Sequence, residues 1–362
     1  MNFRRLVHLV VDDMNVRRRT YSLRSIDMSH LFRRPLKSPG DPGCRPDHHP
    51  PPMEENQKMK PSPLPAPAMS FCPPRRSWFH EGEMAFVLLG GGHNKVVATD
   101  QTGRAVLYDP DQHAVHTLRG FAGPKSTPVS LTIDGDHLYV LDTLPRPSHE
   151  DQCFECLEYN RDGDEDWYPR VLPTPPPYKH EPDPAAEDPT APSVDSYAAS
   201  SDGSCIWVSD ERSGTYSFNT ATAAWSKAGD WALPFSGLAE YVPEHGAWFG
   251  LRDDRCVFCA VDLASASTRR APAVRNLWKD LAPPAEWTVP LRSHLVHLGS
   301  SRFCIARFFT TDPFSSNVYP VTHAVFTAVE VERCADADGG LRMVKHGSKL
   351  YTLLYDMEYW VL

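Results

Sequence analysis

The stretch Thr215-Tyr216-Ser217-Phe218-Asn219-Thr220, with Trp225-Ser226-Lys227 just after it, contains the pattern that decides the fold. Apolar and polar residues alternate in the first run, a polar turn follows, and a tryptophan opens the second run. The run Val106-Leu107-Tyr108-Asp109-Pro110 repeats this arrangement earlier in the chain. Alternation with a period of two is typical of strands that have one buried face. Because aromatic side chains fill the space between packed sheets, the two stretches predict equivalent halves of one repeated β unit.

Short apolar runs of the same kind fill the chain from Ser77 onward and fall into five sets. Each set spans roughly 35–55 residues, which is the repeat length of a four-stranded propeller blade. Turn residues such as Asp134-Gly135 and Asp202-Gly203 separate the runs, since Asp-Gly accepts the positive φ of a tight hairpin. The predicted strands are residues 84–89, 95–99, 105–108 and 114–118; 129–133, 138–142, 153–159 and 167–172; 197–200, 205–209, 214–218 and 223–227; 238–242, 247–251, 255–262 and 267–271; and 294–298, 303–309, 324–331 and 341–345.

Four further apolar runs lie at the two ends of the chain. Residues 5–11 and 21–26 are near the N-terminus, and residues 349–354 and 358–362 are near the C-terminus. Two plus two strands make a sixth unit, because pairing the termini in one sheet removes the open edges of a ring. We therefore predict an all-β protein, a six-bladed kelch-like β-propeller whose last blade is closed by N- and C-terminal strands.

Proline divides the chain into segments. The 35 prolines in 362 residues are about twice the usual share of ~5 %. Thirteen lie between Pro35 and Pro74 and eight between Pro173 and Pro192. We expect N-terminal closing strands over 1–34, a Pro-rich disordered linker over 35–76, and blades over 77–362 with an acidic Pro-rich loop at 173–195. Within that loop, Pro175-Pro176-Pro177-Tyr178 is either a short polyproline II ligand or a stiff surface loop, and the loop is favoured.

Charge is distributed unevenly along the chain. The net charge is −9, but residues 1–80 carry 14 Lys/Arg and 7 Asp/Glu, a net +7, whereas residues 81–362 carry 23 and 39, a net −16. A basic arm could bind nucleic acid or an anionic surface, or be neutralised by its own acidic body. Since Asp12, Asp13 and Asp27 interrupt the basic residues, we favour the second interpretation and do not expect nucleic acid as a partner.

The cysteines and the N-terminal residues bear on the compartment. Nine cysteines, an odd number, are scattered through the chain, and the apolar run after Met1 is too short for a secretory signal. No run reaches the ~20 apolar residues that cross a bilayer. We therefore expect a cytoplasmic or nuclear protein with reduced thiols and no membrane partner.

Three local motifs contain residues that are typical of ligand sites. Cys153-Phe154-Glu155-Cys156 and Cys256-Val257-Phe258-Cys259 could supply four thiolates to zinc, but the pairs lie far apart within predicted strands, which favours buried apolar cysteines. Asp162-Gly163-Asp164-Glu165-Asp166 resembles the start of a calcium loop, but its twelfth position is Pro173, so a solvated hairpin tip is predicted. Gly90-Gly91-Gly92 lacks the Gly-Lys-Ser/Thr of a phosphate loop.

Glu240, Glu244 and His245 form the remaining cluster with acid–base character. They predict either an acid–base site at a blade rim or a solvated loop, and the loop is favoured. We therefore assign no catalytic, cofactor-binding or metal-ligating residue, and we expect no cofactor. A site that draws single residues from several blades into a central funnel would escape a search for local motifs.

Most of the chain outside residues 35–74 and 173–195 resembles a known family. The resemblance rests on Phe3-Arg4-Arg5-Leu6 and the following residues to Asp13, on the run 214–251, which includes Trp225-Ser226-Lys227-Ala228-Gly229-Asp230-Trp231, on residues 341–346, and on Trp360-Val361-Leu362. These segments are similar to a large family of uncharacterised grass proteins, assigned as a plant domain of unknown function. The resemblance implies kelch-like propeller repeats and supplies no catalytic residue.

These features lead us to expect a non-enzymatic scaffold that presents propeller loops to a protein partner. The alternative is an enzyme or small-ligand binder with a site in the propeller funnel, for which a small molecule would be the partner. Clustered titratable side chains at one mouth of the channel would favour the alternative, and an apolar patch on the loops would favour the scaffold.

Overall fold

The structure of the 362-residue chain is a computed structural model, and it describes residues 4–13, 19–32, 59–75, 82–90, 92–145, 147–179, 193–252, 257–279, 289–310, 321–334, 340–354 and 357–362. These residues form β-strands and three short 3-10 helices, so the prediction of an all-β protein is confirmed. The helices are η1 (Pro147–Gln152), η2 (Pro176–Lys179) and η3 (Leu263–Ser265). In the described part of the chain, no helix is long and apolar enough to cross a membrane.

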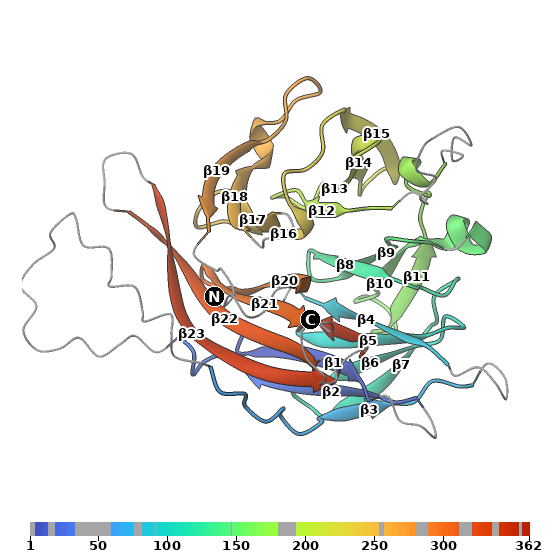
Figure 1. Cartoon of the computed structure of the whole chain (residues 1–362). Coiled ribbons are helices and arrows are strands. Elements are labelled where there is room, and N and C mark those ends of the chain that lie inside the picture. Colours follow the sequence, from blue (N-terminus) through green and yellow to red (C-terminus); the bar gives the residue numbers. More distant parts are fainter. Residues whose placement is uncertain are drawn as a thin grey trace, which may run out of the picture.

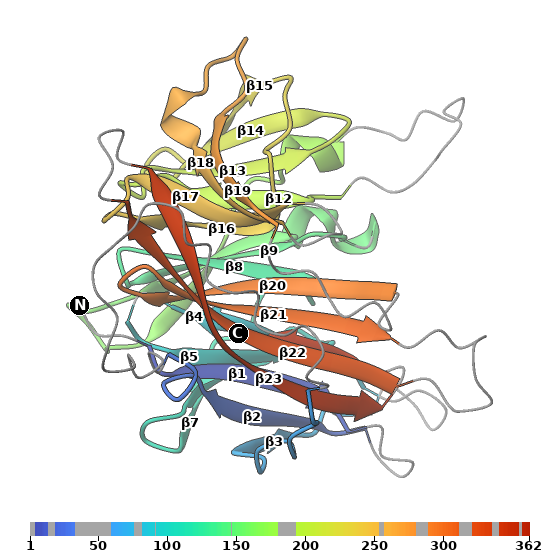
Figure 2. The same ribbon diagram turned by 60° about the vertical axis from the view of Figure 1, so that its left-hand side comes forward.

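The described strands pair into four-stranded antiparallel units, two of which join edge to edge into one eight-stranded sheet (Figures 1 and 2). Unit 1 comprises β4 (Met84–Leu89), β5 (Lys95–Asp100), β6 (Ala105–Asp109) and β7 (Ala114–Leu118). Unit 2 comprises β8 (Pro128–Ile133), β9 (His137–Asp142), β10 (Phe154–Tyr159) and β11 (Trp167–Val171). Unit 3 comprises β12 (Ser196–Ala199), β13 (Cys205–Asp210), β14 (Gly214–Asn219) and β15 (Ala224–Gly229).

Two more units follow in the same pattern, and the last unit joins the termini. Unit 4 comprises β16 (Ser236–Val242), β17 (Ala247–Arg252), β18 (Val257–Asp262) and β19 (Ala273–Trp278). Unit 5 comprises β20 (Val289–Gly299), β21 (Arg302–Thr310), β22 (Val321–Arg333) and β23 (Leu341–Leu354). The closing unit has the order β24 (Tyr359–Val361), β1 (Leu6–Asp12), β2 (Tyr21–Asp27) and β3 (Met69–Phe71).

One predicted strand of the five sets is wrong. Residues 267–271 form a turn in which Ser267 and Arg270 pair only with each other, and β19 begins at Ala273. Pro272 has no N–H to donate to a ladder, so the strand starts after it. From there β19 pairs with β18, with Val261 opposite Val274.

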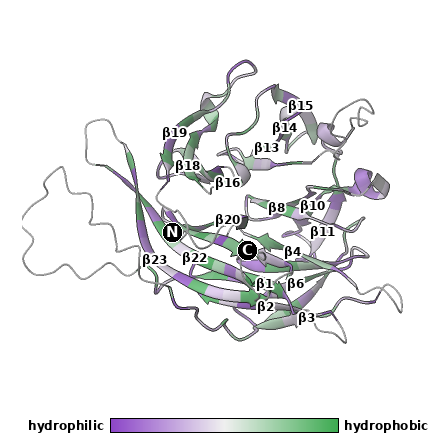
Figure 3. Ribbon diagram, in the orientation of Figure 1, coloured by the Kyte–Doolittle hydropathy of each residue, from purple (hydrophilic) through white to green (hydrophobic). Residues whose placement is uncertain are grey.

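The apolar core lies between the units and closes into a ring. Each of six buried clusters draws its side chains from two units that are neighbours, and the last joins the closing unit to unit 1 through Val10, Tyr21, Phe86 and Tyr108. Large rings such as Phe218, which is fully buried, fill these interfaces. Apolar residues lie mainly on the strands (Figure 3). The result is a propeller-like arrangement in which no unit buries its faces alone.

The inner strands of the units run side by side. β12 and β16 pair in parallel, with Tyr197 opposite Leu238. Between β4 and β8, Gly90 N donates to Thr132 Oγ1 at 2.8 Å, and Ser130 Oγ donates to Leu88 O at 3.0 Å. The first strands of neighbouring units therefore point the same way, and their ends gather at two common mouths.

The prediction that strands from both termini share one sheet is confirmed, but the composition of that sheet is different. It contains three strands from the N-terminal part and one from the C-terminal end. Residues 349–354 belong instead to β23, a strand of 14 residues that pairs along β22, which has 13. A bulge between Thr327 and Val329 lets the two strands stay paired across the bend, so residues 341–354 form one strand rather than two.

The segment that supplies the fourth strand lies within the predicted linker of residues 35–76, of which the structure describes 59–75. Ser62 N donates to Leu350 O, and Ala68 N donates to Leu23 O, both at 2.8 Å. β3 then pairs with β2. Proline is tolerated at the edge of a sheet, because only alternate residues of an edge strand donate an N–H to the neighbouring strand. The second half of the proline island therefore runs along the edges of unit 5 and the closing unit.

The second proline island also contains a fixed anchor. Pro176–Lys179 forms the helix η2, so polyproline II is wrong for these residues. Tyr178 is buried, and its hydroxyl donates to Asp142 O at 3.0 Å and is 3.1 Å from Thr143 O. Residues 180–192 of the predicted 173–195 loop lie outside the described residues.

Candidate functional site

A cavity of about 1010 Å³ runs through the centre of the ring. Residues of β4, β8, β12, β16, β20 and β24, one inner strand from each unit, line it. Its volume is at the upper end of what small-molecule sites occupy, about 300–1,000 Å³. The channel is thus the place where side chains from every unit can meet one ligand.

The two mouths of the channel differ in their polar groups. At the N-terminal mouth, where the inner strands begin, the polar lining residues include Ser126, Thr127, Ser236, Arg292 and Glu358, and the carboxylate of Glu358 pairs with Arg19 at 2.8 Å. We call the other end the C-terminal mouth; its polar lining residues are Arg4, Asp134, Ser200, Asp202 and Glu240. Titratable side chains therefore cluster at the C-terminal mouth, which is the feature expected of a funnel site.

Glu240 is the centre of the C-terminal mouth. Burial raises the pKa of Tyr197, and the Glu240 carboxylate raises it further. Burial lowers the pKa of His297, a shift that the carboxylates of Glu240 and Glu244 oppose. Burial lowers the pKa of Arg4 to about 10, again against the effect of Glu240. Side chains of the N-terminal segment, β12 and β20 thus all interact electrostatically with one carboxylate on β16.

Arg4 is held in place by backbone carbonyls rather than by an acid. Arg4 N donates to Leu298 O at 2.7 Å, Nε donates to Leu6 O at 2.8 Å, and Nη2 donates to Leu362 O at 2.7 Å. Its Nη1 makes no hydrogen bond with the described residues, and the side chain lines the cavity. The carboxylate of Glu240 likewise has no hydrogen bond or ion pair to a described residue.

His294 lies on the channel wall between unit 5 and the closing unit. Its ring meets Phe308 and Tyr359 edge-on, at centroid distances of 5.9 and 6.2 Å. Burial lowers its pKa to about 4, and the nearby Arg292 adds to the shift. His294 is therefore neutral near pH 7, and this part of the wall is apolar apart from the ring nitrogens.

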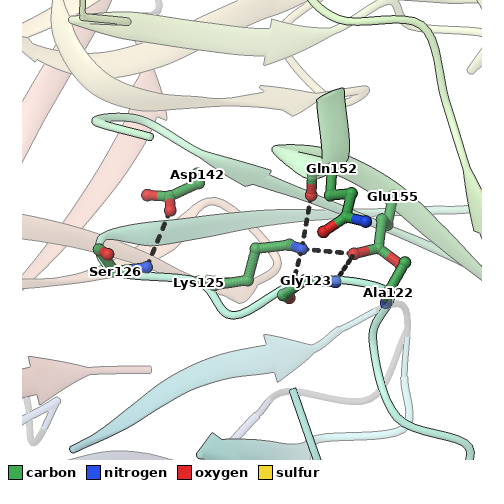
Figure 4. Close-up of polar contacts among 7 residues, drawn as sticks. All are labelled: Ala122, Gly123, Lys125, Ser126, Asp142, Gln152 and Glu155. Atoms are coloured by element: carbon green, nitrogen blue, oxygen red, sulfur yellow. Dashed lines mark hydrogen bonds and ion pairs between the residues drawn. The ribbon is translucent and has the colours of Figure 1, made fainter. Parts of the chain in front are cut away.

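A buried ion pair shapes the N-terminal mouth (Figure 4). Lys125 Nζ donates to Glu155 Oε1, to Gly123 O at 2.9 Å and to Gln152 O at 2.8 Å, and both charged side chains are fully buried. Glu155 also accepts from Ala122 N at 2.9 Å. These contacts fasten the segment between β7 and β8, which carries Ser126 and Thr127 to the mouth of the channel.

The adjacent carboxylate of Asp142, at the end of β9, fixes the same segment. Its Oδ2 accepts from Ser126 N at 2.8 Å, and its Oδ1 accepts from Thr127 N at 2.9 Å and from Thr127 Oγ1 at 3.0 Å. Because each charge of Lys125 and Glu155 and each oxygen of Asp142 has partners, this network positions the backbone and has little capacity left for a ligand.

The sequence-predicted acid–base cluster is divided in the structure. Glu240 lines the channel, whereas Glu244 and His245 lie in the turn between β16 and β17. The ring of His245 packs edge-on against Phe249 at 5.7 Å, and burial together with Arg333 lowers its pKa. The three residues therefore do not converge on one point. The histidine whose pKa both Glu240 and Glu244 affect is His297, in β20.

The cysteine pairs do not meet either. Cys156 lies in β10 and Cys259 in β18, on different units, and Cys256 lies outside the described residues. Burial raises the pKa of Cys153, Cys156 and Cys259 to about 12 each, which keeps the thiols protonated. Within the described ranges, no group of three or more His, Cys, Asp or Glu side chains could hold a metal ion.

The other two motifs are turns. Residues 162–166 form the exposed tip between β10 and β11, where Asp166 Oδ1 accepts from Trp167 N at 2.8 Å. Gly90 ends β4 and Gly92 lies in the turn to β5 with a φ of +99°, while Gly91 lies outside the described residues. Neither segment provides a ligand cradle.

Sequence reasoning missed Arg4, Tyr197 and His294, which line the cavity. One signal could have found two of them: Tyr197 and His294 lie in the first predicted strand of a set, and first strands are innermost in a propeller. Arg4 carried no such signal, since it precedes β1 and reaches the channel only because β1 pairs with β24.

Comparisons with known proteins identify one family. A family model described as "Protein of unknown function (DUF1668)" matches residues 4–351. Among curated proteins no relative of the sequence is found.

Three of the solved structures that match this chain have low structural similarity to it. The β-propeller domain of Cps50 (Swd1) from Myceliophteria thermophila matches with 9% identity and a TM-score of 0.34, over 74% of this chain and 82% of that one. An auxiliary nutrient binding protein from Bacteroides thetaiotaomicron matches with 8% identity and a TM-score of 0.38, over 71% and 56%. A protein of unknown function from the same bacterium matches with 12% identity and a TM-score of 0.37, over 74% and 68%. Similarities this low leave the fold to be judged from the chain's own strand order.

Proposed function

The chain belongs to the DUF1668 family of proteins of unknown function, and we propose that it is a six-bladed, kelch-like β-propeller that binds a small polar ligand in its central channel. The strand order of the six described units and the clusters between neighbouring units support this architecture. The kelch-like character of the repeats and the origin in grasses stay predictions.

One observation carries the binding function. A channel of about 1010 Å³ is lined by all the inner strands and has a cation, carboxylates and hydroxyls gathered at one mouth. Arg4 and Glu240 both line it, and neither has its charge neutralised by a described ion pair. Half-buried charges without partners cost free energy, and a ligand that pairs with them recovers it.

We propose binding rather than catalysis. An acid–base or nucleophilic mechanism needs a base in hydrogen-bond contact with the group that it activates. Among the described residues, neither His297 nor Tyr197 hydrogen-bonds Glu240, although both interact with it electrostatically. No catalytic residue, cofactor or metal is therefore part of the proposal.

A protein-interaction scaffold is the second candidate, but the exposed apolar residues give it less support than the channel gives to ligand binding. Val115, Val171, Leu277 and Leu354 are large apolar residues that are exposed on the outermost strands β7, β11, β19 and β23. Each comes from a different unit, so they are spread over the rim rather than joined in one patch on the loops. A partner protein, and a cytoplasmic or nuclear location, remain predictions.

A variant that obstructs the C-terminal mouth tests the binding function. Ser201 is exposed, lines the cavity in the turn after β12 and makes no side-chain hydrogen bond to a described residue, so Ser201→Trp should obstruct this mouth with little loss of stability. Thr117→Trp, on the exposed part of β7, is the matched control. Thermal unfolding is measured with neutral sugars, organic acids, nucleosides, polyamines and free amino acids.

We expect at least one of these classes to raise the unfolding temperature of the native chain and of Thr117→Trp, but not of Ser201→Trp. The channel function is overturned if no class shifts the native protein, or if the shift persists in the obstructed variant.

A further inference from the structure

We propose that the C-terminal mouth selects a small zwitterion, a free amino acid, with the carboxylate of the ligand on Arg4 and its ammonium group on Glu240. This inference rests on the proposed channel function and adds the ligand class. It follows from two opposite charges that line one cavity and do not pair with each other.

Arg4 provides the site for the anionic end. Its Nε and Nη2 are occupied by Leu6 O and Leu362 O, so the guanidinium has a defined orientation. Nη1 has no hydrogen bond with the described residues. A guanidinium with free N–H groups is suited to a carboxylate, because charge-assisted hydrogen bonds are about twice as strong as neutral ones.

Glu240 provides the site for the cationic end. Asp134 and Asp202 line the same mouth, so carboxylates outnumber the single guanidinium of Arg4 there. Asp202 is already satisfied: hydrogen bonds from Ser200 and Ser204 lower its pKa to about 2. Glu240 has no such partners, and an ammonium group would supply both charge and three donors.

The two charges of the site do not satisfy each other. Arg4 and Glu240 line the same cavity and form no ion pair, although the Glu240 carboxylate opposes the effect of burial on the pKa of Arg4. An anion bound to Arg4 alone would leave Glu240 without a partner, and a polyamine bound to Glu240 alone would lie near the guanidinium. A molecule that carries both charges satisfies both groups at once, and this is the physical basis of the selectivity.

Calorimetric titration of the full chain tests the ligand class. The probes are the free amino acids, with succinate, putrescine and glucose as the anionic, cationic and neutral comparisons. Glu240→Gln removes one charge of the site, and Arg4→Lys keeps the charge but loses the planar geometry. The matched controls are Glu158→Gln and Arg170→Lys, which change an ion pair on the rim of unit 2.

We expect at least one amino acid to bind, with affinity at least about tenfold weaker in Glu240→Gln and Arg4→Lys and unchanged in both controls. Because Arg4 also joins the two ends of the chain, thermal unfolding is measured for each variant, and Glu240→Gln serves as the variant independent of that joint. Unchanged amino acid affinity in a folded Glu240→Gln overturns the proposal.

The outcome also separates the two proposals. If glucose, succinate or putrescine binds in the channel and amino acids do not, the zwitterion proposal fails and the channel function stands. If none of the probes binds and no class of compound stabilises the native chain, both fail.

Discussion

The substitution Glu155→Gln tests whether the buried ion pair with Lys125 holds the N-terminal mouth of the channel together. The change preserves the volume of the side chain and removes its charge. Lys125 would keep two carbonyl acceptors, Gly123 O at 2.9 Å and Gln152 O at 2.8 Å, but would lose the carboxylate of Glu155, the one anionic group that it contacts among the described residues. The ammonium would then be a buried charge without compensation.

The expected cost follows from these contacts. Breaking a buried ion pair by removing one partner costs about 3–5 kcal/mol. Because two carbonyls still accept from Lys125, we expect the lower end, about 3 kcal/mol. With a urea slope of about 3 kcal/mol per M, the unfolding midpoint should fall by about 1 M at unchanged slope.

A double-mutant cycle with Lys125→Met isolates the pair. We expect each single variant to be strongly destabilised and the double variant to lose about 2 kcal/mol less than the sum of the two. Glu158→Gln, which breaks the half-exposed pair with Arg170, is the control and should cost less than about 1 kcal/mol. The reasoning is refuted if Glu155→Gln costs no more than this control, or if the two single variants are additive.

Three further outcomes are expected. Trp360→Ala removes the edge-on ring contacts to Tyr21 and Phe86, at centroid distances of 5.6 and 5.1 Å. It should lower the free energy of unfolding by about 3 kcal/mol, measured by reversible urea unfolding. An unchanged unfolding midpoint would show that β24 does not close the ring. Burial lowers the pKa of His8 from 6.5 to about 3, so between these pH values mainly the unfolded state takes up the proton. The contribution of His8 to stability therefore falls by about 2 kcal/mol between pH 7 and 5. His8→Gln should make the free energy of unfolding less dependent on pH by this amount, and an unchanged pH dependence contradicts the prediction. Tyr178→Phe removes the hydroxyl hydrogen bonds to two backbone carbonyls and should cost about 1–2 kcal/mol, measured by urea unfolding; a cost near zero would mean that η2 is not anchored there.

The strands were predictable because their signals are local. The alternation in Val106–Tyr108 and Tyr216–Phe218, and turn residues such as Asp134-Gly135, act within a few residues, so β6, β14 and the β8–β9 hairpin follow from them. Within the five sets, the strand predicted at residues 267–271 was misplaced, and there Pro272 interrupts the pattern. There, pairing with β18 decides the boundary, and a single segment does not contain that information.

The closing sheet was predictable only in part. That the termini pair follows from the need to remove open edges, and β24 does pair with β1. Which strands complete the closing sheet depends on how the neighbouring strands pair. Residues 341–354 pair along β22 as one strand, β23, so they do not join the closing sheet. The free edge of β2 pairs with Met69–Phe71 instead. Nothing in a proline-rich segment predicts that three of its residues will complete a sheet.

The candidate site was not predictable from local sequence. Glu240 was singled out, but with Glu244 and His245, which are close to it in the sequence and do not line the channel with it. The groups whose pKa values the Glu240 carboxylate affects are Arg4, Tyr197 and His297, which are far away along the chain.

The sequence of this protein by itself determined its strands, its turns and the need for a closed ring, because alternation, turn residues and terminal apolar runs act over short distances. Only the tertiary structure decided which strands complete the closing sheet and which side chains face the channel. The reason is physical: each blade buries its faces only against its neighbours, so the position of an inner strand, and of every charge on it, is set by contacts around the whole ring.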